Sequence, residues 1–498
     1  MRWVRINALI FCATVLFAQT PVPRIWDDAQ LADWATPLAT LNVRPAHFTS
    51  EEYYRVPADN LRTYPVYPPD REPPGYWEWL QAQKPQPLVD AAQIRTNDDW
   101  VAAGKRAFFE LDGVLARTND PATIARARDP ESFNGVYTLA DGSVLDPRWV
   151  VTEQGVMLTM SDCTNCHMRA RPGADPLFAG PLASWPAQMP QPRPSGLPVF
   201  EFFGRAFSRL FLDEPFGIAF WRTIAAPWVP DERVDRLREM TDVTQIGALF
   251  GGNTGTVPRT NGSPFYGTRV PDLHVLRYNK YLDSTGTHRL RGPEDVARYV
   301  ALITGADPME FGAHQMLTPE QRRVPYRFAD EVLYAIGMYL LALEPPTNPD
   351  TVPENVLSAG ARIFGEQGCG GCHAPPDYTN GKLTLAEGYQ APPDHPNRDD
   401  IAGISAGTDA GLALRTRKGT GFYKVPSLRG LWYRPFLLHD GSVASLGELF
   451  DPERLNPEHV PGGWKEPGVE RRAVSGHRYG LDLTAEDKES LLAFLRSL

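Results

Sequence analysis

Two short motifs, each a pair of cysteines followed by a histidine, constrain this chain more than any other feature of its sequence. One holds Cys163, Cys166 and His167, and the other holds Cys369, Cys372 and His373. The pattern C-x-x-C-H is typical of covalent attachment of a c-type haem. Two thiols at this spacing reach both haem vinyl groups from one helical turn, and the adjacent imidazole ligates the iron. We therefore predict two covalently bound haems, with His167 and His373 as iron ligands.

A zinc site and a redox dithiol are the alternatives for these motifs. The chain has five cysteines, and Cys12 alone lies outside the two motifs. Zinc sites usually take cysteine pairs that lie close together in sequence, whereas these pairs begin at Cys163 and Cys369. Because both pairs are also followed by histidine, haem attachment is favoured over zinc or dithiol chemistry.

The first 20 residues indicate the compartment. Arg2 and Arg5 precede or flank a short apolar stretch over residues 8–18. A basic start, an apolar core and a small residue near its end predict a cleaved secretory signal, and hence a periplasmic or secreted protein. A retained membrane anchor is the alternative, but a spanning helix needs about 20 apolar residues. No later stretch is long and apolar enough to predict stable membrane insertion.

Length and charge narrow the possible partners. A chain of 498 residues predicts two or three domains. Its 50 basic and 60 acidic residues give a net charge of −10, which argues against nucleic acid as a partner. A small redox protein that donates or accepts electrons suits this charge better.

An internal repeat suggests how the chain is organised. Residues 103–108 match residues 359–364, each in a short helical pattern that precedes a haem motif. Two amphipathic patterns, over residues 329–341 and 485–495, predict closing helices. Thr484 with Asp487 resembles a capping box at the start of the last helix.

The repeat predicts two cytochrome c-like haem domains. The first covers residues 96–344 and the second residues 354–498, divided where prolines at 345–349 end a helix. Residues 21–95 are rich in proline and aromatic residues and predict an extended N-terminal arm. The expected fold is mainly α, with long irregular loops.

Two stretches of the chain resemble known families. Residues 425–431 (Val-Pro-Ser-Leu-Arg-Gly-Leu), residues 435–442 (Pro-Phe-Leu-Leu-His-Asp-Gly-Ser) and Leu446 resemble the signature of bacterial di-haem cytochrome c peroxidases, which the methylamine-utilisation di-haem enzymes share. The first domain is more similar to the di-haem rubber oxygenases. That similarity lies in residues 261–266, 270–273, 280–283, 287–288 and 298–299.

The resemblance implies a second axial ligand for the second haem. In the peroxidases this ligand is a methionine, or a tyrosine in the methylamine branch, just before the closing helix. This chain has no methionine after Met338 but has His477 at that place, so the resemblance implies a haem held by His373 and His477. His439 is the rival ligand. Otherwise it supports the haem with Asp440 and with Arg429, which would pair with a propionate.

The first haem has no evident sixth ligand, and its catalytic residues stay unknown at the level of sequence. His274, His288, Met240 and Met309 are candidates for the ligand, although each is more readily explained as structural. Glu214, Glu232, Glu239 and Gln245 are candidates for an acid/base, which peroxide cleavage would need near the iron. An apolar run over residues 202–221 could line a pocket or form an ordinary core helix. A calcium ion between the haem domains is implied by the resemblance, without identified ligands.

These features favour a periplasmic di-haem redox enzyme. It would reduce peroxide or activate dioxygen at the first haem, while the second haem relays electrons. A non-catalytic di-haem electron carrier is the main alternative, and a non-catalytic module of a larger redox complex is another.

Overall fold

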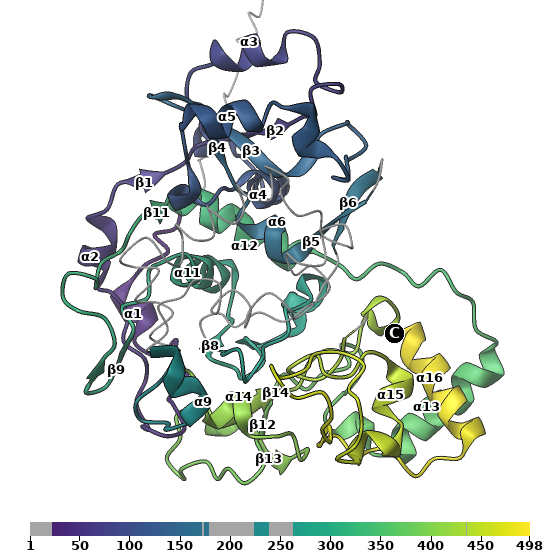
Figure 1. Cartoon of the computed structure of the whole chain (residues 1–498). Helices are drawn as coiled ribbons and strands as arrows, with labels where there is room; N and C mark the ends of the chain where they lie inside the picture. The colour runs from purple at the N-terminus through teal and green to yellow at the C-terminus, as the bar shows by residue number, and fades with distance from the viewer. Residues whose placement is uncertain (1–21, 172–173, 179–223, 239–261, 435) are drawn as a thin grey trace, which may run out of the picture.

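The computed structural model describes residues 22–171, 174–178, 224–238, 262–434 and 436–498 (Figure 1). The predicted secretory signal lies outside the described residues. No helix in the described part of the chain is long and apolar enough to cross a membrane.

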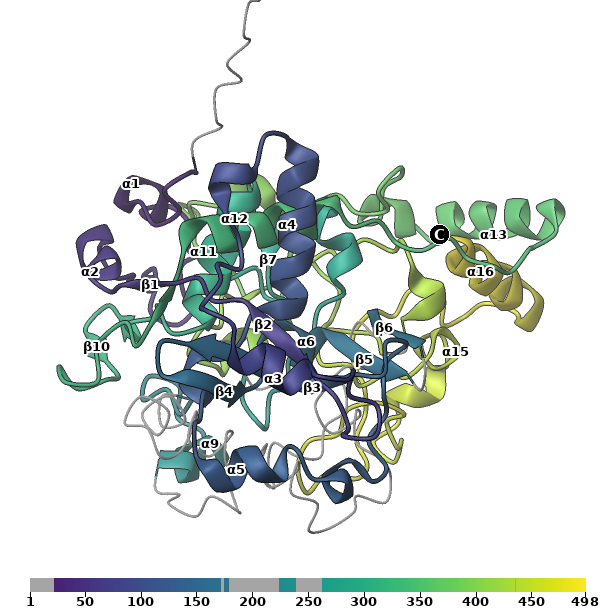
Figure 2. The ribbon, with the colours of Figure 1, turned by 90° about the horizontal axis from the view of Figure 1, so that it is seen from above.

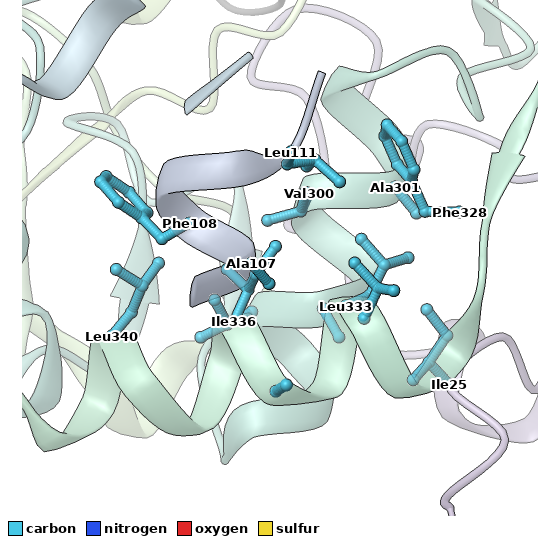
Figure 3. Packing of buried hydrophobic residues seen from close by; sticks show 14 of the residues in the cluster. Ile25, Ala107, Phe108, Leu111, Val300, Ala301, Phe328, Leu333, Ile336 and Leu340 are labelled. Carbon is cyan, nitrogen blue, oxygen red and sulfur yellow. The ribbon is translucent and has the colours of Figure 1, made fainter. Parts of the chain in front are cut away.

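A group of three longer helices forms the centre of the first half of the chain. These helices are α4 (Asn97–Glu110), α11 (Pro293–Ile303) and α12 (Asp330–Ala342). Helix α4 begins after a capping box in which the Thr96 hydroxyl accepts from the backbone N–H of Asp99. Figure 3 shows buried side chains of the three helices packed together, among them Ala107, Val300 and Leu333.

Helices α4 and α12 cross at a very short distance. A Cβ atom at Gly104 would lie 1.8 Å from the carbonyl oxygen of Ala335, so only glycine allows this crossing. Helix α12 covers residues 330–341 of the segment 329–341, where the sequence pattern predicted a closing helix, and it extends one residue further.

The Pro- and aromatic-rich N-terminal segment is part of this core. Trp26 and Trp34 are fully buried, and the Trp26 indole N–H donates to Phe48 O at 2.8 Å. Strand β1 (Ala58–Asp59) pairs with β11 (Arg327–Phe328), and β2 (Thr63–Val66) pairs with β3 (Val144–Thr152). The segment therefore contributes strands to two sheets.

The remaining elements of the first half are short. Its other helices are α1 (Asp28–Leu31), α2 (Ser50–Tyr54), α3 (Tyr76–Gln81), α5 (Pro121–Arg126), α6 (Cys163–His167) and α9 (Glu232–Asp235). Strand β4 (Gly155–Thr159) completes the sheet of β2 and β3. The other strands form two-stranded pairs: β5 (Met168–Arg171) with β6 (Ala174–Phe178), β7 (Tyr281–Leu282) with β8 (His288–Arg289), and β9 (Glu310–Phe311) with β10 (His314–Gln315).

The second half repeats the crossing of a first and a last helix. Helices α13 (Glu354–Glu366) and α16 (Ala485–Ser497) pack together, and a Cβ atom at Gly360 would lie 2.2 Å from Ser490 O. Helix α16 begins after Thr484, whose side chain accepts from the backbone N–H of Asp487, as the sequence predicted. In both views these helices lie together at one end of the molecule, away from α4 and α11 (Figures 1 and 2).

A small sheet and two short helices complete the second half. The sheet has the order β13 (Ile401–Ser405), β12 (Leu383–Leu385) and β14 (Phe422–Lys424). The short helices are α14 (Gly411–Leu414) and α15 (Leu446–Leu449).

The fold is a mixture of helices and short strands, so the expectation of a mainly helical chain is not confirmed. Strands of two to five residues, such as β1, β7 and β12, are too short to show a sequence periodicity. They form where distant segments meet, and that meeting is a property of the tertiary structure.

Candidate haem sites

The second motif opens into a cavity. Helix α13 ends at Glu366, and the left-handed Gly368 (φ 72°) turns the chain into the 3-10 helix η9 (Cys369–Gly371). The thiols of Cys369 and Cys372 and the ring of His373 line a cavity of about 320 Å³. Most of the other lining side chains are apolar, among them Phe364, Leu428, Leu446, Leu449, Phe450 and Leu495. The size and apolar walls are those of a small-molecule or cofactor site.

Two backbone carbonyls decide which ring nitrogen of His373 carries the proton. Its Nδ1 lies 3.2 Å from Tyr378 O and 3.1 Å from Pro426 O. Because a carbonyl oxygen only accepts, Nδ1 carries the proton and Nε2 keeps its lone pair. Burial also lowers the pKa of His373, so the ring stays neutral. A metal-ligating histidine requires this tautomer and this charge.

His477 lies across the cavity from His373. The two ring centroids are 6.5 Å apart. An imidazole–metal bond is about 2.0 Å long and the ring centroid lies about 1.1 Å behind the nitrogen, so two imidazoles on opposite sides of one metal have centroids about 6.3 Å apart. The observed spacing therefore fits two axial ligands of one iron.

The loop that carries His477 is held by a buried arginine. His477 has a left-handed backbone (φ 47°), and its N–H donates to Ala406 O at 2.6 Å. Arg454 is fully buried and donates to the carbonyls of Val474, Gly476 and His477 at 2.5, 2.8 and 2.8 Å. These bonds determine where the imidazole points. No local sequence pattern identified Arg454, because its acceptors lie some 20 residues downstream.

The state of the His477 ring also fits a ligand. Burial, followed by the effects of His373 and Arg454, lowers the pKa of His477 to about 4, so the ring is neutral near pH 7. Its Nδ1 is buried and has no hydrogen-bond partner among the described residues. The thiols, the two imidazoles and the apolar walls together fit a covalently attached haem, whose iron His373 and His477 would ligate.

His439 and Arg429, the other residues predicted for this site, lie in different places. His439 lines the cavity, with its ring 4.6 Å from that of Tyr423 and its Nε2 3.4 Å from an oxygen of Asp409. Arg429 is not among the described lining residues. It donates to Pro376 O at 3.2 and 3.0 Å, so its predicted pairing with a propionate gains no support from this geometry.

A cluster of Asp409, His439 and Asp440 brings three possible metal-ligand atoms within 4.8 Å of one another. Its carboxylates are already engaged, because Asp440 accepts from Arg472 and from the backbone N–H of Ser442, and Asp409 accepts from the N–H of Gly411. The cluster therefore does not locate the calcium ion that the resemblance implied.

The first motif forms helix α6. Cys163 packs against the core of the first half, and the ring of His167 lies 6.4 Å from that of Phe108 on α4. Met168, the next residue, is fully buried. The side chain of Cys166 lies outside the described part of the structure.

Most candidates for the distal side of the first haem fall outside the described residues. These are Glu214, Glu239, Met240, Gln245 and the apolar run 202–221. Glu232 is exposed on α9. His274 lies 3.1 Å from Asp272, His288 is buried against Trp34, and Met309 packs with Phe311. These contacts are typical of structural residues, and the roles of the three side chains stay predictions.

Comparisons with known proteins give distant similarities. No family model and no curated protein matches the chain. A MauG-like protein associated with microbial copper homeostasis is 18% identical, with a TM-score of 0.29, over 57% of this chain and 88% of that one. The Kuenenia stuttgartiensis hydrazine synthase is 16% identical, with a TM-score of 0.28, over 59% and 91%. The diheme peroxidase BthA from Burkholderia thailandensis E264 is 17% identical, with a TM-score of 0.34, over 88% and 95%.

Proposed function

We propose that the chain is a di-haem c-type cytochrome that acts as a redox enzyme, reducing peroxide or activating dioxygen at the first haem while the second haem relays electrons. The observation that carries the proposal is the placement of His373 and His477 on opposite sides of a cavity lined by the thiols of Cys369 and Cys372. Bound haem iron would supply one-electron redox chemistry at this site.

The residues around the second site suit a relay. His373 and His477 would occupy both axial positions and so leave none for a substrate. The apolar side chains of Phe364, Leu449 and Phe450 line the cavity. A cofactor held by two protein ligands between apolar walls suits electron transfer better than substrate chemistry.

The residues around the first motif suit a reaction site. His167 has no opposing protein ligand that the sequence identifies. The predicted first domain, residues 96–344, is also much longer than one electron-transfer haem needs. We assign the reaction with peroxide or dioxygen to this site for these reasons. A non-catalytic electron carrier is the alternative, and it would require a protein ligand on each side of both irons.

We propose that the protein acts in the periplasm or outside the cell, with a small redox protein as its partner. The basic and apolar start of the chain supports export to the periplasm or beyond. There, a small redox protein would exchange electrons with the second site. We also propose a calcium ion between the haem domains, as the resemblance implies. We infer no nucleic-acid partner and no stable membrane insertion.

Electron paramagnetic resonance of the oxidised full-length protein tests the proposal. We expect one low-spin signal from the second haem and one high-spin signal from the first, and we expect peroxide to alter the high-spin signal. Two low-spin signals that are unchanged by peroxide, and by reduction under oxygen, would overturn the enzyme and leave the carrier.

A further inference from the structure

Three basic side chains line the cavity of the second motif. Arg269, Lys424 and Arg434 all line it, and the described lining residues include no aspartate or glutamate. A buried charge is costly unless an opposite charge or strong hydrogen bonds compensate it. An anion is therefore expected at this part of the cavity.

One of the three cations is already compensated. Arg434 donates through Nε to the buried carboxylate of Asp272 at 2.9 Å and through Nη1 to Ser427 O at 2.9 Å. Tyr433 also donates to Asp272 at 2.6 Å, so this carboxylate is fully engaged.

Arg269 and Lys424 form no ion pair within the described parts of the chain. Arg269 donates through Nη1 to Phe436 O at 2.8 Å, and the Lys424 ammonium has a long contact of 3.5 Å with Tyr281 O. Burial and the neighbouring Arg434 lower the pKa of Arg269 to about 10, and burial lowers that of Lys424 to about 8 despite the opposing effect of Asp283. Both side chains thus have unused capacity to bind a carboxylate.

The three cations lie close to one another in the cavity lining. Arg269 and Arg434 both lower the pKa of Lys424, as neighbouring positive charges do. A haem carries its two propionates side by side on one edge, so neighbouring cations match the chemistry of that edge.

We propose that Arg269 and Lys424 bind the two propionate carboxylates of the haem attached to Cys369 and Cys372. This inference rests on the proposed function. Arginine and lysine both pair strongly with carboxylates, and two cations balance two carboxylates. The two residues also have equivalent places in the sequence, because each precedes a Val-Pro pair, at Val270-Pro271 and at Val425-Pro426.

The first half of the chain thereby supplies part of the second haem site. The backbone N–H of Arg269 donates to His439 O at 2.9 Å, and its side chain bonds Phe436 O, so this segment is docked on the loop that lines the cavity. Binding of the haem would join residues of both predicted domains.

We call the binding of the two propionates by Arg269 and Lys424 the clamp. Variants of the full-length protein test it. The test variants are Arg269→Gln and Lys424→Gln, and Arg269→Lys keeps the charge. Arg398→Gln is the matched control, because Arg398 is exposed, donates to Pro393 O and is not among the residues that line the cavity. The readouts are the reduction potential of the low-spin haem and the propionate bending mode in resonance Raman spectra.

We expect each glutamine variant at the cavity to shift the bending mode and to favour the ferric state by about tenfold in the reduction equilibrium, or about 59 mV for one electron. Arg269→Lys and Arg398→Gln should stay close to the unmodified protein. An unchanged potential and bending mode in both cavity variants would overturn the clamp, and so would an equal shift in Arg398→Gln.

The two proposals fail in different ways. If the clamp is wrong, the cavity variants keep their potential and bending mode while the unmodified protein still shows its low-spin signal. If the relay is wrong, the unmodified protein itself lacks that low-spin signal. If Arg269→Gln loads no haem while Arg269→Lys does, the requirement for a cation is supported. If neither Arg269 variant accumulates, the result for Lys424→Gln decides.

Discussion

The rings of His373 and His477 lie 6.5 Å apart at an interplanar angle of 53°, and both line the cavity of the second motif. One ring has its Nδ1 bound to two carbonyls, and the other is placed by a loop that a buried arginine holds. The pair defines where an iron would be ligated.

Replacing the motif cysteines should remove haem from one site at a time. Cys369→Ser combined with Cys372→Ser should halve the covalently bound haem, and Cys163→Ser combined with Cys166→Ser should remove the other half, because each thioether needs its own thiol. Haem per chain is measured by the pyridine haemochrome assay on denatured protein. A full haem content in either double variant would contradict the assignment of that motif.

His477→Ala should convert the second haem from low spin to high spin, because it removes one of two strong axial ligands. Electron paramagnetic resonance measures the change. His459→Ala is the matched control, since His459 binds Glu448 at 3.0 Å and does not line the cavity. An unaltered low-spin signal in His477→Ala would show that another residue, with His439 the first to test, is the ligand.

Arg454→Met should destabilise the protein and loosen the His477 ligand. The change leaves the buried carbonyls of Leu449, Val474 and Gly476 without their donor, at a cost on the order of 3 kcal/mol in free energy of unfolding. Denaturant unfolding measures the cost, and the low-spin signal should broaden or weaken. Arg471→Met, at an exposed arginine, should change neither quantity.

Gly360→Ala should destabilise the crossing of α13 and α16 by about 1–3 kcal/mol, because the added methyl group would overlap Ser490 O. Gly365→Ala is a control on the same helix, where nothing lies within 4 Å of the added Cβ. It should be neutral or stabilise by about 0.5–1 kcal/mol through helix propensity. Thermal or denaturant unfolding compares the two. Equal effects would mean that the helices are not in close contact at Gly360.

Asp146 should make stability fall as the pH rises from about 4 to 7. Burial raises the pKa of Asp146 from 3.8 to about 7. The positive charge of Arg148 opposes this rise, and the negative charge of Asp162 adds to it. One of its oxygens accepts from the Ser161 N–H at 2.6 Å, and the other has no partner among the described residues. The folded chain therefore holds a proton that the unfolded chain has released above pH 4, so unfolding becomes easier until the folded group also ionises near pH 7.

The matched test of this pH dependence uses Asp146→Asn and the exposed Asp70→Asn. Asp146→Asn should reduce the loss of unfolding free energy between pH 4 and 7 by at least about 1 kcal/mol, the value of roughly one pKa unit. Asp70→Asn should leave the loss unchanged. If both variants match the unmodified protein, the carboxyl of Asp146 titrates normally in the folded chain.

Local patterns predicted the helices well. The repeated pattern at residues 103–108 and 359–364 falls within α4 and α13, and the closing patterns fall on α12 and α16. Helical periodicity and capping depend on residues a few positions apart, so they can be found in sequence. The short strands could not be found, because each pairs with a partner far along the chain, as Ala58 does with Arg327.

The residues of the cofactor site likewise include some that the sequence predicted and some that it did not. The positions of the thiols and of His373 follow from five consecutive residues, and resemblance to known signatures added His477. Arg454, Arg269 and Lys424 have no such pattern, since each acts on groups that are brought near by folding. Arg429 was predicted at the haem from the signature, whereas Arg434 is the arginine of that segment that lines the cavity.

The sequence by itself determined where haem can be attached, because C-x-x-C-H places its thiols and imidazole within one turn of backbone. Only the tertiary structure decided what lies opposite His373 and what surrounds the cavity. More than one hundred residues separate His373 from His477, and the direction of the second imidazole depends on its left-handed backbone and on the bonds from Arg454. Those are long-range contacts, and they exist only once the chain has folded.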